Sequence, residues 1–178
     1  MVKETHTKGA YIFSLLVLPF VVSKFLFNYE LIYKFILILI YIYFSYVGSL
    51  FPDIDIKNSY ISKTFPKLHK TLGSKFRHRG MTHSLIFIYI LCNIFNLLVQ
   101  YTENNVVFIC SSAGFILGYL SHLCLDLLTK EGIEIFYPVS INFSLLPIKT
   151  SSKTERLFCK ILNFIFIFLL GYRFYLLI

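Results

Sequence analysis

The sequence predicts an all-α membrane protein, a polytopic bundle of about four or five transmembrane helices with cytoplasmic interfacial loops. The 178 residues are 57% hydrophobic and only 15% charged, with a mean hydropathy of +0.71. A soluble domain of this length usually carries about a quarter charged residues. The apolar residues also gather into stretches of roughly 20, the length that crosses a bilayer as a helix. Because no repeat or break in composition divides the chain, we expect residues 1–178 to form one membrane-embedded domain.

The apolar stretches are, in chain order, Ala10 to Asn28, Leu31 to Phe51, His83 to Tyr101, Val106 to Leu128 and Leu157 to Ile178. The loop after the second stretch is basic, and its apolar residues recur every three or four positions, as on an interfacial amphipathic helix. These residues are Ile61, Phe65, Leu68, Leu72 and Phe76. Pro66 interrupts the pattern, so two short helices are expected there. The apolar segment 133–148 is broken by Pro138 and Pro147, and we expect it to lie at the interface or to fold over the spans.

The net charge of +8 is concentrated in two loops. Seven lysines and arginines lie between Phe51 and His83, and four more lie between Lys130 and Arg156. Positive residues mark cytoplasmic loops, so the N-terminus and both long loops are expected inside and the C-terminus outside. A basic surface at the membrane attracts anionic headgroups. Membrane lipids are therefore the expected partners, and nucleic acid is not.

Seven histidines and aspartates fall at the expected cytoplasmic ends of these spans: His6, Asp53, Asp55, His78, His83, His122 and Asp126. His122 and Asp126 are four residues apart and share one helix face. Gly114 and Gly118 precede them on that face, and small residues at this spacing let a neighbouring helix approach closely. The seven side chains are thus expected to meet in one polar pocket at the end of the bundle.

In the stretch PDID, Pro52 disfavours helix at the preceding residue. We therefore expect Asp53 and Asp55 to leave the second span in an extended conformation, which would point both carboxylates to the same side. In the stretch HRGMTHS, a glycine permits a tight turn, and Thr82 or Ser84 is expected to cap the third span. Arg77 and Arg79 beside it are suited to a bidentate grip on a phosphate oxygen.

Imidazoles and carboxylates together suit zinc, manganese or iron. Catalytic zinc uses about three protein ligands, so seven candidates imply either two metals or several residues in supporting and acid–base roles. Taken singly, the residues have simpler explanations. The two aspartates are compatible with a polar helix stop, His78 with a solvated side chain, and the arginines with topology signals. Ionisable groups at membrane depth are nevertheless functional candidates.

The motifs PDID, HRGMTHS, GYLSHLCLD and LLTKEGIEIFYP resemble, in this order, those of the YdjM-like membrane proteins. This family is described as membrane-bound metal-dependent hydrolases regulated by the LexA repressor. Such proteins carry a histidine beside or a few residues ahead of a glycine before the first span, and here His6 lies three residues before Gly9. The ligand types are also similar to those of zinc-dependent phospholipases C, which favours phosphoester chemistry.

The residues and the resemblance together imply a metal-dependent hydrolase of the bacterial inner membrane, with its N-terminus and site facing the cytoplasm. The implied substrate is a phosphoester such as a lipid headgroup, and the implied cofactor is a divalent metal, zinc first and manganese second. The expected metal ligands are His6, Asp53, Asp55, His78, His83, His122 and Asp126, and the expected catalytic residues are Asp55, Arg77 and Arg79. Two alternatives stay open, a divalent-metal transporter and a non-catalytic membrane scaffold.

Overall fold

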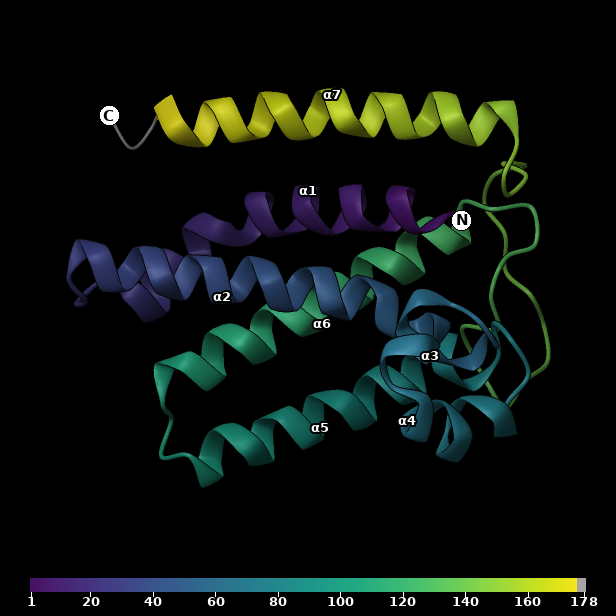
Figure 1. The fold of residues 1–178 in the computed structure, drawn as a ribbon, viewed down its shortest axis with the longest axis horizontal. Coiled ribbons are helices and arrows are strands. Elements are labelled where there is room, and N and C mark those ends of the chain that lie inside the picture. Colours follow the sequence, from purple (N-terminus) through teal and green to yellow (C-terminus); the bar gives the residue numbers. More distant parts are fainter. Residues whose placement is uncertain (176–178) are drawn as a thin grey trace.

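The computed structural model describes residues 1–175, which fold as a bundle of roughly aligned helices (Figure 1). The long helices are α1 (Lys3–Val21), α2 (Leu31–Leu50), α5 (Leu85–Tyr101), α6 (Val106–Leu127) and α7 (Lys153–Tyr175). Within the described residues there are isolated β-bridges but no strands. The prediction of an all-α fold is confirmed.

Four helical segments are long and apolar enough to cross a membrane: Lys3–Leu26, Leu31–Asp55, Val106–Leu127 and Lys153–Tyr175. The helix α5 is also apolar but shorter, at 17 residues. Both α1 and α7 begin several residues before the stretches that hydropathy marks, at Lys3 and Lys153. Their first turns are polar, so an apolar pattern cannot reveal them.

Helices α2 and α6 pack more closely than any other pair of long helices in the described chain. A Cβ atom added to Gly118 would lie 1.9 Å from the carbonyl oxygen of Ser45, and one added to Gly114 would lie 2.1 Å from that of Tyr41. The two backbones therefore touch where these glycines face α2, as the sequence predicted. On α2, Gly48 makes the same kind of contact with Phe115 of α6.

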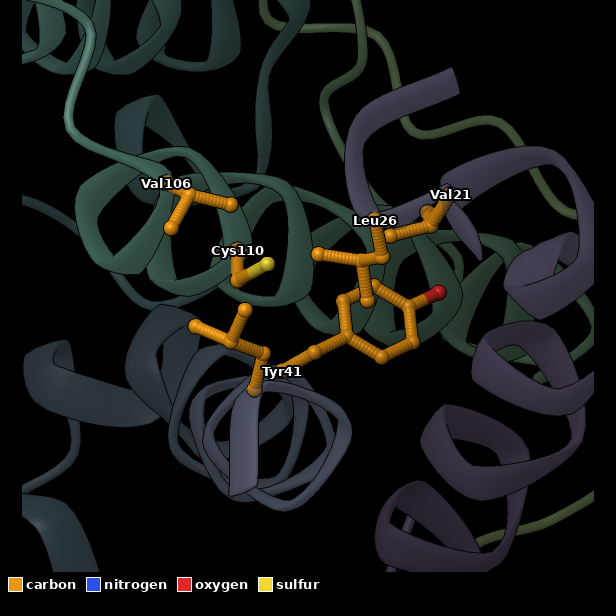
Figure 2. Packing of buried hydrophobic residues seen from close by; sticks show 6 residues of the cluster. Val21, Leu26, Tyr41, Val106 and Cys110 are labelled. Carbon is orange, nitrogen blue, oxygen red and sulfur yellow. The ribbon is translucent and has the colours of Figure 1, made fainter. Parts of the chain in front are cut away.

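The far half of this interface is an apolar core in which side chains from three segments meet (Figure 2). Tyr41 from α2 packs there beside Val106 and Cys110 from α6. Val21 enters from the end of α1, and Leu26 from the π-helical turn Val22–Leu26 that follows it. Toward the middle of the bundle the contacts become polar. Tyr41 donates a hydrogen bond to the carbonyl oxygen of Ser14 over 3.1 Å, and the hydroxyls of Ser14 and Ser45 are 2.7 Å apart. These bonds fix α1 against α2.

The basic loop after α2 forms four short helical pieces: α3 (Tyr60–Thr64), α4 (Pro66–Thr71) and two 3-10 turns, Gly73–Lys75 and Met81–His83. The break between α3 and α4 falls at Pro66, which confirms the prediction of two short helices. Ile61 is buried with Leu50 and Ile54, and Leu68 packs against them. Part of the predicted amphipathic stripe thus faces the end of α2 instead of lipid.

The predicted extended conformation of Asp53 and Asp55 is wrong. Residues Phe51–Asp55 continue α2 as a 3-10 turn, with Phe51 in the right-handed helical region (φ −64°, ψ −37°). Pro52 occupies the start of this turn, where its fixed φ fits and no backbone N–H is needed. With three residues per turn, side chains two apart diverge, and the two carboxylates point toward different partners.

Candidate metal centre

All seven predicted ligands meet at one end of the bundle, although they come from four separate segments. His6 lies at the end of the first turn of α1. Asp53 and Asp55 lie in the 3-10 turn after α2, and His122 and Asp126 in the last turns of α6. The remaining two, His78 and His83, precede α5. Close packing of α2 on α6 holds these segments together.

The most buried part of the cluster consists of His83, His122 and Asp126. The Nε2 atoms of the two histidines are 3.2 Å apart, and Asp126 Oδ2 lies 3.5 Å from His122 Nε2 and 3.7 Å from His83 Nε2. Nitrogen and oxygen ligands of one tetrahedral zinc ion, at about 2.0–2.1 Å from it, are roughly 3.3 Å from one another. The three atoms are thus spaced for a shared cation.

Hydrogen bonds on the opposite ring edges fix the tautomers of both histidines. His122 Nδ1 is 2.6 Å from the carbonyl oxygen of Ser49, which only accepts, so Nδ1 carries the proton. The Thr82 hydroxyl donates to Asp55 Oδ2 over 2.8 Å and can therefore only accept from His83 Nδ1, 3.0 Å away. When both rings are neutral, the two Nε2 atoms present lone pairs to each other, 3.2 Å apart. Such an arrangement is stabilised by a metal ion or a proton between them.

The His83 ring is neutral at neutral pH. Burial, reinforced by the neighbouring His122 ring, lowers the pKa of His83 to about 3. Metal binding requires unprotonated imidazole, so the lone pair of His83 Nε2 is available to accept from a cation or from the neighbouring ring.

His6 joins the cluster from the other side of His122. The two rings stack in parallel, with centroids 3.6 Å apart and planes inclined by 7°. His6 is fully buried, its Nε2 is 3.4 Å from Asp126 Oδ1, and neither ring nitrogen has a hydrogen-bond partner among the described residues. Because buried polar atoms are nearly always satisfied, this orphaned imidazole fits a ligand role. Together with Asp53 and His122 it forms a second group with metal-ligand spacing.

The cluster opens to solvent on the side of Asp53 and His78, whose side chains are 19% and 43% exposed. These two residues and His83 form a third group with metal-ligand spacing. Asp55 lies behind His78, with Oδ1 3.1 Å from His78 Nδ1, and its Oδ2 accepts from the backbone N–H of Arg79 over 3.2 Å. Exposure thus rises from the inner residues to this outer pair.

The two predicted arginines have opposite placements. Arg79 turns inward: its Nη2 is 3.6 Å from Asp126 Oδ2, and its Nη1 donates to Thr129 Oγ1 over 3.0 Å. Its φ of 65° lies in the left-handed region, which a residue with a side chain keeps only where its surroundings hold it. Arg77 lies on the surface, 3.5 Å from Glu134, so a catalytic role for Arg77 stays a prediction.

Several supporting residues were not predicted. Ser49 contributes only a backbone carbonyl, which no side-chain pattern reveals. Tyr119 donates to the carbonyl oxygen of Thr82, and its place one turn before His122 on α6 was the available signal. Ser84, one of the two predicted caps, does cap α5 through the N–H of Phe87, which leaves Thr82 free to bind Asp55.

Replacing Thr82 with Val should lower metal affinity about 10- to 100-fold, the usual effect of losing an outer partner of a ligand. Valine keeps the shape but removes the hydroxyl that orients Asp55 and His83. Thr82→Ser keeps the hydroxyl and should bind metal within a few-fold of wild type. Competition titrations with a zinc chelator measure both. Equal affinities in the two variants would contradict the orienting role.

The YdjM inner membrane protein family model matches residues 1–177 of this chain. The protein YvsG of Bacillus subtilis (strain 168) is 40% identical over 112 residues, which cover 62% of this chain and 66% of YvsG. Inner membrane protein YdjM of Escherichia coli (strain K12) and its counterpart in Shigella flexneri are each 35% identical over 108 residues, 61% of this chain and 54% of theirs. The chain thus matches just under two thirds of YvsG and about half of YdjM. No solved structure matches it. This chain belongs to the YdjM family of inner membrane proteins.

Proposed function

We propose that this protein is a metal-dependent hydrolase that cleaves a phosphoester at the cytoplasmic surface of the membrane. One observation carries the proposal: the Nε2 atoms of His83 and His122 face each other beside Asp126, at the spacing of cation ligands. The orphaned ring of His6 supports it. Two or three imidazoles with carboxylates favour zinc, and manganese is the second choice.

A divalent cation bound there would act as a Lewis acid and lower the pKa of a water molecule. The chain's own residues supply the rest of the chemistry. The Arg79 guanidinium places positive charge beside Asp126, which favours an anionic phosphoryl group. When the ester P–O bond breaks, the leaving oxygen needs a proton. His78, on the open side and backed by Asp55, is placed to donate it.

The position of the metal cluster at helix ends also favours a hydrolase over a metal transporter. Transport sites tend to lie near the middle of the bilayer, at interrupted helices. Here His122 and Asp126 lie in the last turns of α6, and Asp53 follows the end of α2. The basic loops that flank the site support a cytoplasmic orientation.

The first test is the metal content of the detergent-purified protein by elemental mass spectrometry. We expect one or two equivalents of zinc or manganese in the wild type, and less than a tenth of that in His122→Ala and Asp53→Ala, because each removes a ligand. His69→Gln is the matched control, since His69 Nδ1 contacts the carbonyl oxygen of Ile54 and lies outside the cluster. Wild-type protein without metal, even after reconstitution, would refute the hydrolase proposal.

Protein that holds metal can then be assayed for activity. Release of phosphate from dioleoyl phosphatidic acid in vesicles, and hydrolysis of water-soluble p-nitrophenyl phosphate, should both be followed with and without prolonged prior incubation with EDTA. EDTA-sensitive turnover that His122→Ala abolishes would support the proposal. Metal bound without turnover of any phosphoester would leave a metal-stabilised scaffold.

A further inference from the structure

The segment between α6 and α7 exposes an unusual number of large apolar side chains. Six of its residues between 136 and 146 are 38% to 71% exposed: Phe136, Val139, Ile141, Phe143, Leu145 and Leu146. They lie outside every helix that could cross a membrane. Two of them, Phe136 and Phe143, pack edge to face with ring centroids 5.2 Å apart. Exposed apolar side chains gathered on one segment mark a site of interaction with protein or membrane. We call these six residues the apolar loop face.

The structure holds this segment across the end of the bundle. The N–H of Leu145 donates to the carbonyl oxygen of Leu127 over 2.7 Å, next to the end of α6, and Ile133 and Phe143 form a small antiparallel bridge. Figure 1 shows the segment running past the same end of the bundle at which α7 begins. Since α6 and α7 are both membrane spans by length and composition, their connection starts and ends at the membrane surface.

The charges around the apolar loop face match an anionic bilayer surface. Lys130 and Lys149 flank it, and Lys153 and Arg156 follow in the first turn of α7; all four are exposed. Basic residues beside exposed apolar side chains are typical of segments that lie in the boundary between headgroups and acyl chains. We propose that the apolar loop face inserts into the surface of the membrane that its own helices cross.

The inserted segment is tied directly to the candidate metal centre through Arg79. The carbonyl oxygen of Arg79 accepts from the N–H of Glu134 over 3.0 Å, and its Nη1 donates to the carbonyl oxygen of Gly132 over 3.2 Å. The same residue contacts Asp55 through its backbone and Asp126 through its guanidinium. Membrane insertion of the loop would therefore hold the Arg79 side of the centre close to the headgroups.

The consequence concerns the substrate and rests on the proposed function. A centre held at headgroup level meets phosphoesters that are anchored in the bilayer at high local concentration. Soluble phosphoesters gain nothing from this placement. The loop therefore favours a phospholipid headgroup as the substrate class.

Insertion can be tested without any activity, because the chain contains no tryptophan. Leu145→Trp introduces one at a position that is 71% exposed, so the fold has little to lose. The variant is reconstituted in vesicles of phosphatidylcholine and phosphatidylglycerol, with or without brominated acyl chains. We expect brominated lipid to reduce its emission to about half, and iodide in the water to have little effect, as for a side chain below the headgroups.

Lys57→Trp is the matched control, at an exposed position in the other long loop. It should be quenched by iodide and not by brominated lipid. If Leu145→Trp behaves like this control, the loop lies in water and the proposal is wrong. Protection from both quenchers would also overturn it, because a protein surface would then cover the loop.

A second measurement addresses the substrate. Leu145→Glu should lower hydrolysis of dioleoyl phosphatidic acid in vesicles about tenfold, because a carboxylate replaces an inserted leucine. Hydrolysis of p-nitrophenyl phosphate should stay unchanged, since Leu145 lies outside the metal cluster. Equal loss on both substrates would contradict the role in lipid access. Wild-type protein inactive on both would refute the hydrolase proposal, while the quenching result would still decide insertion.

Discussion

Asp126→Asn is expected to lower metal affinity by more than about 100-fold, beyond the 10- to 100-fold effect of an outer partner. The two carboxylate oxygens of Asp126 lie close to three histidines of the cluster. They lie 3.4 Å from His6 Nε2, 3.5 Å from His122 Nε2 and 3.7 Å from His83 Nε2. Asparagine has the same shape but no charge, and its amide nitrogen is not a ligand. It would also leave the Arg79 guanidinium and the N-terminal ammonium, 2.7 Å from Oδ1, without their counter-charge.

Metal content and a chelator competition titration would measure this effect. Glu155→Gln is the matched control, because Glu155 is another buried carboxylate at the start of α7. It accepts from the N–H groups of Val2 and Ser151 at 2.6 Å each, and not from the cluster. The control should lose about 1–3 kcal/mol of stability and keep its metal. Full metal content in Asp126→Asn would remove Asp126 from the ligand set.

Gly118→Ala is expected to separate α2 from α6 and to destabilise the protein by about 3 kcal/mol or more. The new Cβ would lie 1.9 Å from the carbonyl oxygen of Ser45 and 2.9 Å from its Cα. These are backbone atoms, so no side-chain rotation relieves the clash, and the helices must move apart. Because His122 is one turn further along α6 and bonds the carbonyl oxygen of Ser49, metal affinity should fall as well.

Thermal unfolding in detergent, followed by circular dichroism, would measure this loss. Gly171→Ala in α7 is the control, since a Cβ there has no heavy atom within 4 Å. Its stability should stay within about 0.5 kcal/mol of wild type. A similar midpoint in both variants would mean that α2 and α6 do not depend on this glycine contact.

The convergence of the candidate ligands could be predicted from the sequence, because it depends on the lengths and orientations of the spans. Span length and the distribution of lysines place helix ends on one side of a membrane. The four-residue spacing of His122 and Asp126 then follows from helix geometry. The close contact at Gly114 and Gly118 could also be predicted, because small residues at that spacing in apolar helices usually mark a place where another helix packs closely.

Finer features depend on contacts that a single chain does not reveal. The proline rule for the stretch PDID describes an average preference, and continued helical hydrogen bonding after Leu50 outweighed it. Nothing in the sequence separated Arg77 from Arg79, because their placements depend on where the segment after α6 folds back. The carbonyl that orients His122 is a backbone atom of Ser49, which any residue at that position would supply. Contacts of this kind join residues that are far apart in the chain, so local sequence patterns do not reveal them.

The burial gradient across the cluster also has a kinetic meaning. An ion held by His83, His122 and Asp126 would have no water-exposed ligand, whereas Asp53 and His78 reach solvent. Loading would therefore begin at the outer pair and proceed inward by ligand exchange. Release would have to wait for a local opening of the bundle end. A chelator should then strip the metal at a rate that is independent of its own concentration, so short dialysis would leave purified protein loaded.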